Sequence, residues 1–157
     1  MLMRRCLLLL LLLSLLSGCG GQDPFPRSLY DRFAEVYPLE AGVLYDSEAK
    51  RSDPEYLDPL LLATLLRRSD GSYDGEDIAS AVLYLGAAGD GHRELLILRC
   101  HNRDSAREVA ALCVARTELL RTSVGAEARV LLSGKTVVLL ALSDNASAER
   151  LLRRMLE

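Results

Sequence analysis

The sequence predicts an α+β fold: a four-stranded, mainly antiparallel sheet with helices packed on it, plus two N-terminal helices. Three observations lead to this prediction. Strand-like segments occur in two pairs, 78–85 with 94–100 and 129–133 with 136–142. Each pair is followed by a segment whose apolar residues have helical spacing. The chain is 50% hydrophobic and 26% charged, which is typical of a folded domain rather than a disordered chain.

The first 18 residues have the pattern of an export signal. Arg4 and Arg5 give a positively charged start, and the apolar run from Leu7 to Leu16 is broken only by Ser14. This run is shorter than the roughly 20 residues that span a bilayer. We therefore treat it as a signal peptide and leave it out of the fold.

The signal peptide ends in the pattern of a bacterial lipobox, Leu16, Ser17, Gly18 and Cys19. The small residues let a peptidase approach, and the thiol of Cys19 accepts a diacylglycerol group. Further acylation by a palmitate-type chain makes such an anchor stable. An ordinary secretory signal with an incidental cysteine is the alternative.

Lipidation at Cys19 divides the chain into a signal peptide (1–18), a lipidated tether (19–27) and a single domain (28–157). At about 3.5 Å per residue the tether reaches roughly 25 Å, so the domain stays near the membrane. We expect localisation at the cell membrane, with the domain on the extracytoplasmic side. Loss of the leader removes two arginines and moves the formal net charge from −3 to −5. Since a nucleic-acid-binding protein has a basic stripe, no nucleic-acid partner is expected.

Two helices are expected before the first strand pair. The first begins with Ser28 and Asp31, which resemble a capping box, and ends before Pro38. The second follows Asp58-Pro59, an N-cap with proline at the first helical position, and covers residues 60–68. The stretch between them has mixed character and predicts no regular element.

From residue 78 onward, strand and helix periods alternate. A glycine-rich hairpin loop at 86–91 separates the first strand pair. Ser105 and Glu108 form a capping box for the next helix, and Gly125 follows its end. In the second pair, Gly134-Lys135 suits a two-residue type II′ turn.

The simplest arrangement of these elements is a meandering sheet with helices on one face, including a final helix over 145–156. Strands 79–85 and 136–142 are apolar at both odd and even positions, however. Both sheet faces therefore need cover, either from the two N-terminal helices or from a partner.

Cys100 and Cys113 remain after the leader, with Cys6, is removed and Cys19 is lipidated. They lie in a compartment where disulfides form. Cys113 falls in the third turn of the helix after Cys100, about 13 Å along it, whereas a disulfide needs Cα atoms within roughly 7 Å. We favour two buried thiols, with a disulfide as the alternative.

Two glycine patterns resemble nucleotide sites. Gly134-Lys135-Thr136 looks like the end of a phosphate-binding loop, but Arg129 stands where that loop needs glycine, and a strand follows. The glycines at 86, 89 and 91 open no helix and do not match a dinucleotide fingerprint. No nucleotide or other cofactor is expected.

Asp70, Ser72, Asp74 and Gly75 match the first half of a calcium loop, in which alternating oxygen ligands precede a glycine turn. The second half fails, because Ala81 stands where the bidentate glutamate is needed. A solvated acidic loop is the preferred interpretation. Calcium binding by the first three residues is the weak alternative.

The other metal-type side chains are His92, Cys100, His101 and Cys113. Cys100 and His101 are neighbours on a strand and point to opposite faces, and His92 lies at the far end of the hairpin. Neither a shared zinc nor a Cys–His dyad is expected. There is also no Gly-x-Ser-x-Gly motif, so the sequence predicts no catalytic residue.

Three stretches carry a family resemblance: 78–86 (IASAVLYLG), 98–102 (LRCHN) with the helix through Cys113, and 128–137 (ARVLLSGKTV). They resemble a domain-of-unknown-function family of small bacterial lipoproteins, mostly from Gram-positive gut bacteria. The similarity covers most of residues 28–156. That family has no assigned activity. The resemblance therefore implies a location, a single membrane and α+β character, but no site residues.

These features favour a membrane-anchored lipoprotein with a non-catalytic extracytoplasmic binding or adapter domain. An envelope protein partner would use a sheet face or a sheet edge. Two alternatives stay open. One is a small-ligand or calcium-sensing lipoprotein, and the other is an envelope hydrolase whose site is not visible in the sequence.

Overall fold

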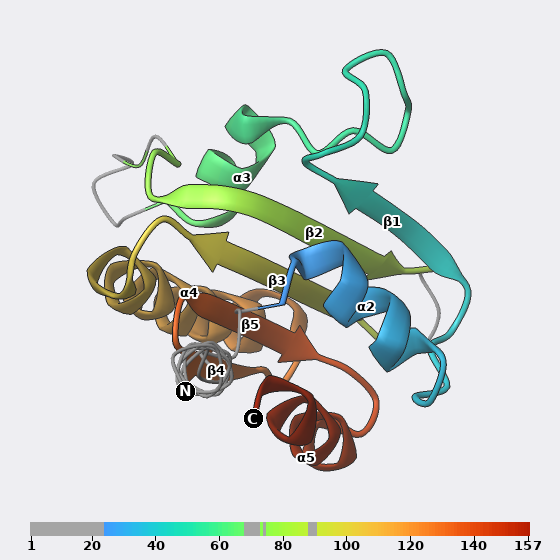
Figure 1. Cartoon of the computed structure of the whole chain (residues 1–157). Coiled ribbons are helices and arrows are strands. Elements are labelled where there is room, and N and C mark those ends of the chain that lie inside the picture. The colour runs from blue at the N-terminus through green and yellow to red at the C-terminus, as the bar shows by residue number, and fades with distance from the viewer. Residues whose placement is uncertain (1–23, 68–72, 74, 88–90) are drawn as a thin grey trace, which may run out of the picture.

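The computed structural model describes residues 24–67, 73, 75–87 and 91–157 (Figure 1). Its elements in chain order are α2 (Pro26–Ala34), β1 (Gly42–Asp46), α3 (Pro59–Leu65), β2 (Ile78–Gly86), β3 (Glu94–Cys100), α4 (Arg103–Val124), β4 (Arg129–Ser133), β5 (Thr136–Ala141) and α5 (Asn145–Leu156). The predicted α+β class is confirmed. None of the described helices is both long enough and apolar enough to cross a bilayer.

The described strands form one antiparallel sheet in the order β1-β2-β3-β5-β4. It is not the simple meander expected from the sequence. α4 carries the chain back along the sheet, so β4 starts at the end where β3 started and runs parallel to it. The antiparallel position beside β3 is therefore filled by β5. This leaves β1 and β4 as the two edges of the sheet.

The sequence predicted four strands and two N-terminal helices with no strand between them. This is wrong, because the described sheet has a fifth strand, β1, which lies between α2 and α3 in the chain. β1 pairs with β2 from Gly42↔Gly86 to Asp46↔Val82. As an edge strand it carries little of the apolar alternation that predicts a strand, and Val43 is 48% exposed. Its place is set by pairing with the buried strand β2 rather than by its own sequence pattern.

Helices cover both faces of the sheet, so the simple arrangement with helices on one face is wrong, whereas the expectation that both faces need cover is confirmed. α3 and α4 pack on one face, and α2 and α5 pack on the other (Figure 1). The first core includes Leu62, Leu83, Leu96, Leu98 and Leu139, and the second includes Phe33, Leu95, Ile97, Leu140 and Leu152. Both layers are required because consecutive residues of β3 are apolar and fully buried.

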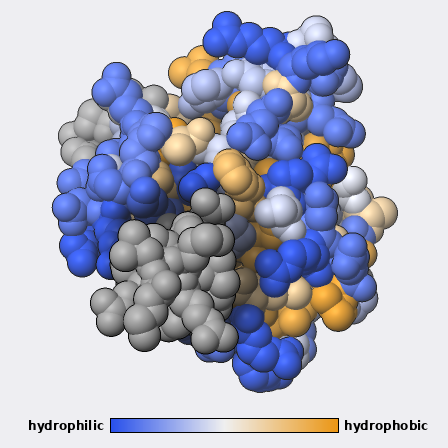
Figure 2. Space-filling model, viewed as in Figure 1, coloured by the Kyte–Doolittle hydropathy of each residue, from blue (hydrophilic) through white to orange (hydrophobic). Residues whose placement is uncertain are grey.

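The outer surface over α2 and α5 is mainly hydrophilic. Figure 2 shows this face, where hydrophilic residues predominate and the apolar ones form scattered patches, the broadest toward the lower right. Both helices direct a row of apolar residues to the sheet and charged residues to solvent, as amphipathic helices do. A sheet face is therefore not available to a partner, and that part of the expected partner surface is corrected.

Two helix starts differ from the predicted capping boxes. The Ser28 hydroxyl donates to the carbonyl of Phe25 at 2.9 Å and does not cap α2, which has no side-chain cap. α4 starts before Ser105, because Asn102 accepts from two backbone N–H groups of the first turn, at 2.9 Å each. Asp58 caps α3 as predicted, accepting from a backbone N–H at 2.7 Å.

Two glycines behave as predicted. Gly125 ends α4 with a left-handed φ of 67°, and the N–H of the next residue, Ala126, donates to the carbonyl of Leu120 at 3.2 Å. Gly134 has a φ of 56°, while Lys135 has none of the positive φ that a type I′ turn needs. This pair of angles fits the type II′ turn expected between β4 and β5.

Candidate functional site

The most specific residues predicted from the sequence lie outside the described residues. These are the lipobox residues Leu16, Ser17, Gly18 and Cys19, and the weak calcium candidates Asp70, Ser72 and Asp74. Within the described part of the chain, no group of three or more His, Cys, Asp or Glu side chains could hold a metal ion. Lipidation and calcium binding therefore stay predictions.

The two cysteines of the domain are buried, free thiols in the core between the sheet and α4. Burial raises the pKa of Cys100 to about 12, with a smaller effect from the charge of Asp77. Burial also raises the pKa of Cys113 to about 12. Since the thiolate is the reactive form, both thiols are poor nucleophiles near neutral pH. His101 is exposed, outside this core, and His92 precedes the opposite end of β3.

A polar cleft of about 400 Å³ opens at the end of the sheet where β3 begins and β5 ends. Its walls come mainly from three connections: Gly91–Arg93 before β3, Val124–Glu127 after α4, and Leu142–Ala146 before α5. α5 starts at this cleft, but its N-cap Asp144 already accepts from the N–H of Ser147. The cleft brings several polar groups from separate connections together, which makes it a candidate ligand site.

A buried charge pair lies beside the cleft. The carboxylate of Glu94 is fully buried and receives two hydrogen bonds from Arg116 of α4, from Nε and from Nη2, at 2.7 Å each. His92 Nε2 lies 2.8 Å from the same carboxylate. Because an ionised carboxylate only accepts, His92 donates from Nε2 to Glu94.

The protonation of Glu94 follows from these contacts. Burial alone raises its pKa, but the hydrogen bonds from His92 and Arg116 and the positive charge of Arg116 outweigh burial. The net effect holds the pKa of Glu94 below its ordinary value of 4.5. Glu94 is therefore ionised at neutral pH, and the pair joins β3 to α4 under the cleft.

The cleft suits binding better than hydrolysis. A histidine with a carboxylate partner is half of a catalytic triad, but Arg116 already neutralises the carboxylate that would stabilise an imidazolium. Hydrogen bonds from Ser147 lower the pKa of Asp144, so this cleft carboxyl is ionised and is no general acid near neutral pH. The described cleft thus offers hydrogen-bonding groups for a small polar ligand.

β4 forms an open edge of the sheet. In its hairpin register, Ser133↔Thr136, alternate residues of β4 bond to β5, and the backbone groups of Val130 and Leu132 turn outward. Among the described residues, none bonds these outward groups. The other edge, β1, is partly closed, because Asp46 exchanges backbone hydrogen bonds with the segment at Glu55–Leu57.

A small pocket adjoins the β4 edge. It has a volume of about 150 Å³ and is lined by Leu131–Ser133 together with Arg153, Leu156 and Glu157 at the end of α5. Leu132 is 46% exposed. Proteins usually protect an open edge with proline, a bulge or several charges, whereas β4 has only Arg129. Open backbone groups beside a pocket that can receive a side chain are the features that strand addition uses.

Arginines flank this edge. Arg150, Arg153 and Arg154 lie exposed on α5. Arg129 and Arg153 share the single carboxylate of Glu149, at 2.6 and 2.7 Å. Two arginines beside β4 therefore share one carboxylate, and Glu157 brings a second acid to the pocket.

A scan against protein-family models, a search of curated proteins and a search of solved structures each found no match. The resemblance to a lipoprotein family therefore stays an expectation.

Sequence reasoning did not find Glu94, Arg116 or the β4 edge. One signal for the charge pair was present, because Arg116 falls on the apolar stripe of its helix and a buried arginine needs an acid on the facing strand. No comparable signal marks β4 as an edge. Its position depends on which strand β5 joins, and this is a property of the whole sheet.

Proposed function

We propose that this protein is a membrane-anchored lipoprotein whose extracytoplasmic domain is a non-catalytic binding module. In this proposal the domain takes an extended segment of an envelope protein onto the edge of β4. The observation that carries it is the outward-turned backbone of Val130 and Leu132 beside a small pocket of mixed polar and apolar lining. The membrane anchor rests on the lipobox ending in Cys19.

The covered sheet faces support the edge as the binding surface. Since helices pack on both faces, a partner strand gains main-chain hydrogen bonds only at an edge, and β4 is the more open of the two. The pocket beside Leu132, lined by leucines together with Ser133, Arg153 and Glu157, then receives a side chain of the partner.

Two substitutions at one position test this surface. Leu132→Pro removes an outward N–H without removing a hydrogen bond to β5, and Leu132→Thr keeps the N–H while changing the side chain. We expect Leu132→Pro to abolish recovery of the crosslinked partner from intact cells, and Leu132→Thr to retain part of it. Equal recovery from both variants, with unchanged thermal unfolding, would contradict strand addition.

The anchor is tested separately with Cys19→Ala. We expect the natural protein to carry a diacylglyceryl group on Cys19 and the variant to lack both the lipid and cleavage at this site. Mass spectrometry of the membrane-extracted protein measures both. A variant that is still diacylated and cleaved would remove the lipoprotein proposal.

A second candidate function is small-ligand binding in the cleft. It is favoured by His92, which lines the cleft and whose ring is held by its hydrogen bond to Glu94. Native mass spectrometry of the purified protein would then detect a retained small molecule, which His92→Ala releases. If both proteins have the same ligand-free mass, this candidate is removed.

A further inference from the structure

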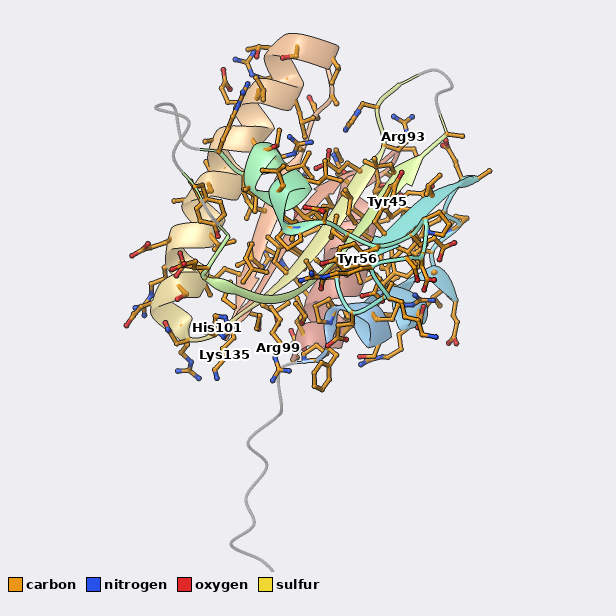
Figure 3. The ribbon with its side chains drawn as sticks, turned by 90° about the horizontal axis from the view of Figure 1, so that it is seen from above. Tyr45, Tyr56, Arg93, Arg99, His101 and Lys135 are labelled. Carbon is orange, nitrogen blue, oxygen red and sulfur yellow. The ribbon has the colours of Figure 1, made fainter. Side chains whose placement is uncertain are left out.

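Basic side chains gather at one end of the domain. Figure 3 shows Arg99, His101 and Lys135 side by side at this end, whereas Arg93 lies at the opposite end of the sheet. They come from the end of β3, the residue after it, and the turn between β4 and β5. Arg103, the first residue of α4, is exposed close to His101 in the chain.

The chain enters the domain at the same end. The guanidinium of Arg99 lies over the ring of Phe25, 4.4 Å from its centre. Phe25 is 52% exposed, although it is a large apolar residue. Six residue steps separate it from Cys19, which limits the distance between them to roughly 20 Å. An acyl chain on Cys19 would therefore hold this end of the domain nearest to the bilayer.

The arginines at this end have no acidic partner in the described part of the chain. Arg99 contacts the ring of Phe25, and Arg103 makes no ion pair there. Two acids lie nearby: Asp104 pairs with Arg107, and the charge of Asp77 acts on Cys100, so the basic residues outnumber the acids rather than stand alone. The mature chain as a whole carries a net charge of −5, so this end differs in sign from the rest.

We propose that this end, the surface formed by Phe25, Arg99, His101, Arg103 and Lys135, docks on the bilayer and binds anionic lipid headgroups. The inference rests on the proposed lipid anchor. An exposed aromatic ring and adjacent arginines match the polar interface of a membrane. The acidic remainder of the domain is repelled by the same lipids, so charge alone orients the sheet with its strands directed away from the bilayer.

Each basic side chain of this surface adds to the affinity of the domain for an anionic membrane. A basic side chain near an anionic surface strengthens binding about fivefold, and the effect fades within roughly one Debye length, about 8 Å in physiological salt. Removing Arg99 and Arg103 together should therefore weaken docking on the order of 25-fold. The lipid tether itself is unaffected by this change, so the protein stays on the vesicle but its domain is released.

The two lysines of the sequence provide the measurement. Lys135 lies in the proposed surface and Lys50 lies in the connection after β1. The lipidated protein is placed in vesicles of phosphatidylcholine alone or with phosphatidylglycerol, and a water-soluble amine-acylating reagent is applied. We expect phosphatidylglycerol to slow acylation of Lys135 several-fold and to leave Lys50 unchanged. High salt should reverse the protection.

Paired variants decide the interpretation. Arg99→Gln with Arg103→Gln should restore the Lys135 rate, whereas Arg121→Gln with Arg150→Gln, which removes the same charge elsewhere, should not. Equal Lys135 rates in both lipids would overturn the membrane-facing surface. Suppose that Lys135 is protected only in native membranes, and that Arg99→Gln with Arg103→Gln keeps this protection. A neighbouring protein would then cover the surface, and the proposal of lipid binding would be overturned. A protein that lacks the diacylglyceryl mass fails the anchor proposal instead, which keeps the two failures distinct.

Discussion

At the scale of single residues, Glu94 and Arg116 are the most consequential contact of the fold. Glu94→Gln keeps the shape of the side chain but leaves the mostly buried guanidinium of Arg116 without a counter-charge. We expect this to lower the free energy of unfolding by about 3 kcal/mol or more, because breaking a buried pair exposes the cost of the remaining charge. Urea unfolding at neutral pH measures the change.

Replacing both Glu94 and Arg116 shows whether the loss of stability comes from the unpaired charge or from altered packing of the core. Glu94→Gln with Arg116→Met should recover much of the loss, since a neutral pair avoids the uncompensated charge. Glu118→Gln, in an exposed helical pair with Arg121, should change stability little. A double variant that is less stable than Glu94→Gln alone would contradict this explanation.

The same carboxylate predicts a pH dependence. Because the pKa of Glu94 is lower in the folded state than its ordinary value, its stabilisation is fully present above that value. It is lost as the pH falls through the lowered folded value, in the range below about pH 4.5. Urea midpoints measured down this range should fall more steeply for the natural protein than for Glu94→Gln, and parallel curves would remove the assignment.

The buried cysteines predict low thiol reactivity. With the pKa of both thiols raised to about 12 by burial, neither Cys100 nor Cys113 should react with a disulfide-exchange reagent near neutral pH while the protein is folded. Both should react once guanidinium chloride unfolds the chain. Rapid labelling of the folded domain, or two missing thiols after unfolding, would contradict the free buried pair.

At the scale of elements, the start of α4 distinguishes two capping schemes. Asn102→Ala should lower stability by about 1 kcal/mol, because Asn102 satisfies two N–H groups of the first turn. Ser105→Ala serves as the control and should have a smaller effect, since Ser105 lies inside the helix. Thermal unfolding of the two variants measures this, and the reverse order would favour the capping box predicted from the sequence.

Local sequence signals predicted the elements that carry their own pattern. The four strands with strong apolar runs, the Asp58 cap and the Gly134 turn all follow from neighbouring residues. β1 was missed because its pairing with β2 supplies what its own residues lack. The order of the strands was missed because it depends on the length and direction of α4, which brings β4 to an edge and β5 inside.

At the scale of the whole molecule, helices cover both faces of the sheet and the β4 edge stays open. A partner strand can therefore pair with the sheet only at its edge. Apolar residues at odd and even positions of 79–85 and 136–142, in β2 and β5, predicted that both faces need cover, and the helices supply it within the chain. The candidate cleft was not predictable, since its three walls lie far apart in sequence. The proposed tether, the basic end that faces the bilayer and the binding edge at β4 are compatible with one another. When the basic end faces the bilayer, the strands are directed away from it, and the β4 edge stays accessible to a partner from the side.

The most direct test of edge binding is photo-crosslinking in intact cells with a photoreactive residue at position 132. Position 114 is the control, because Val114 is exposed on α4, away from the edge. We expect one discrete adduct at position 132, joined to an extended peptide of the partner, no equivalent at 114, and loss of the adduct when Val130→Pro blocks a second outward N–H. Equal adducts at both positions, or an adduct that survives Val130→Pro, would contradict binding at the edge of β4.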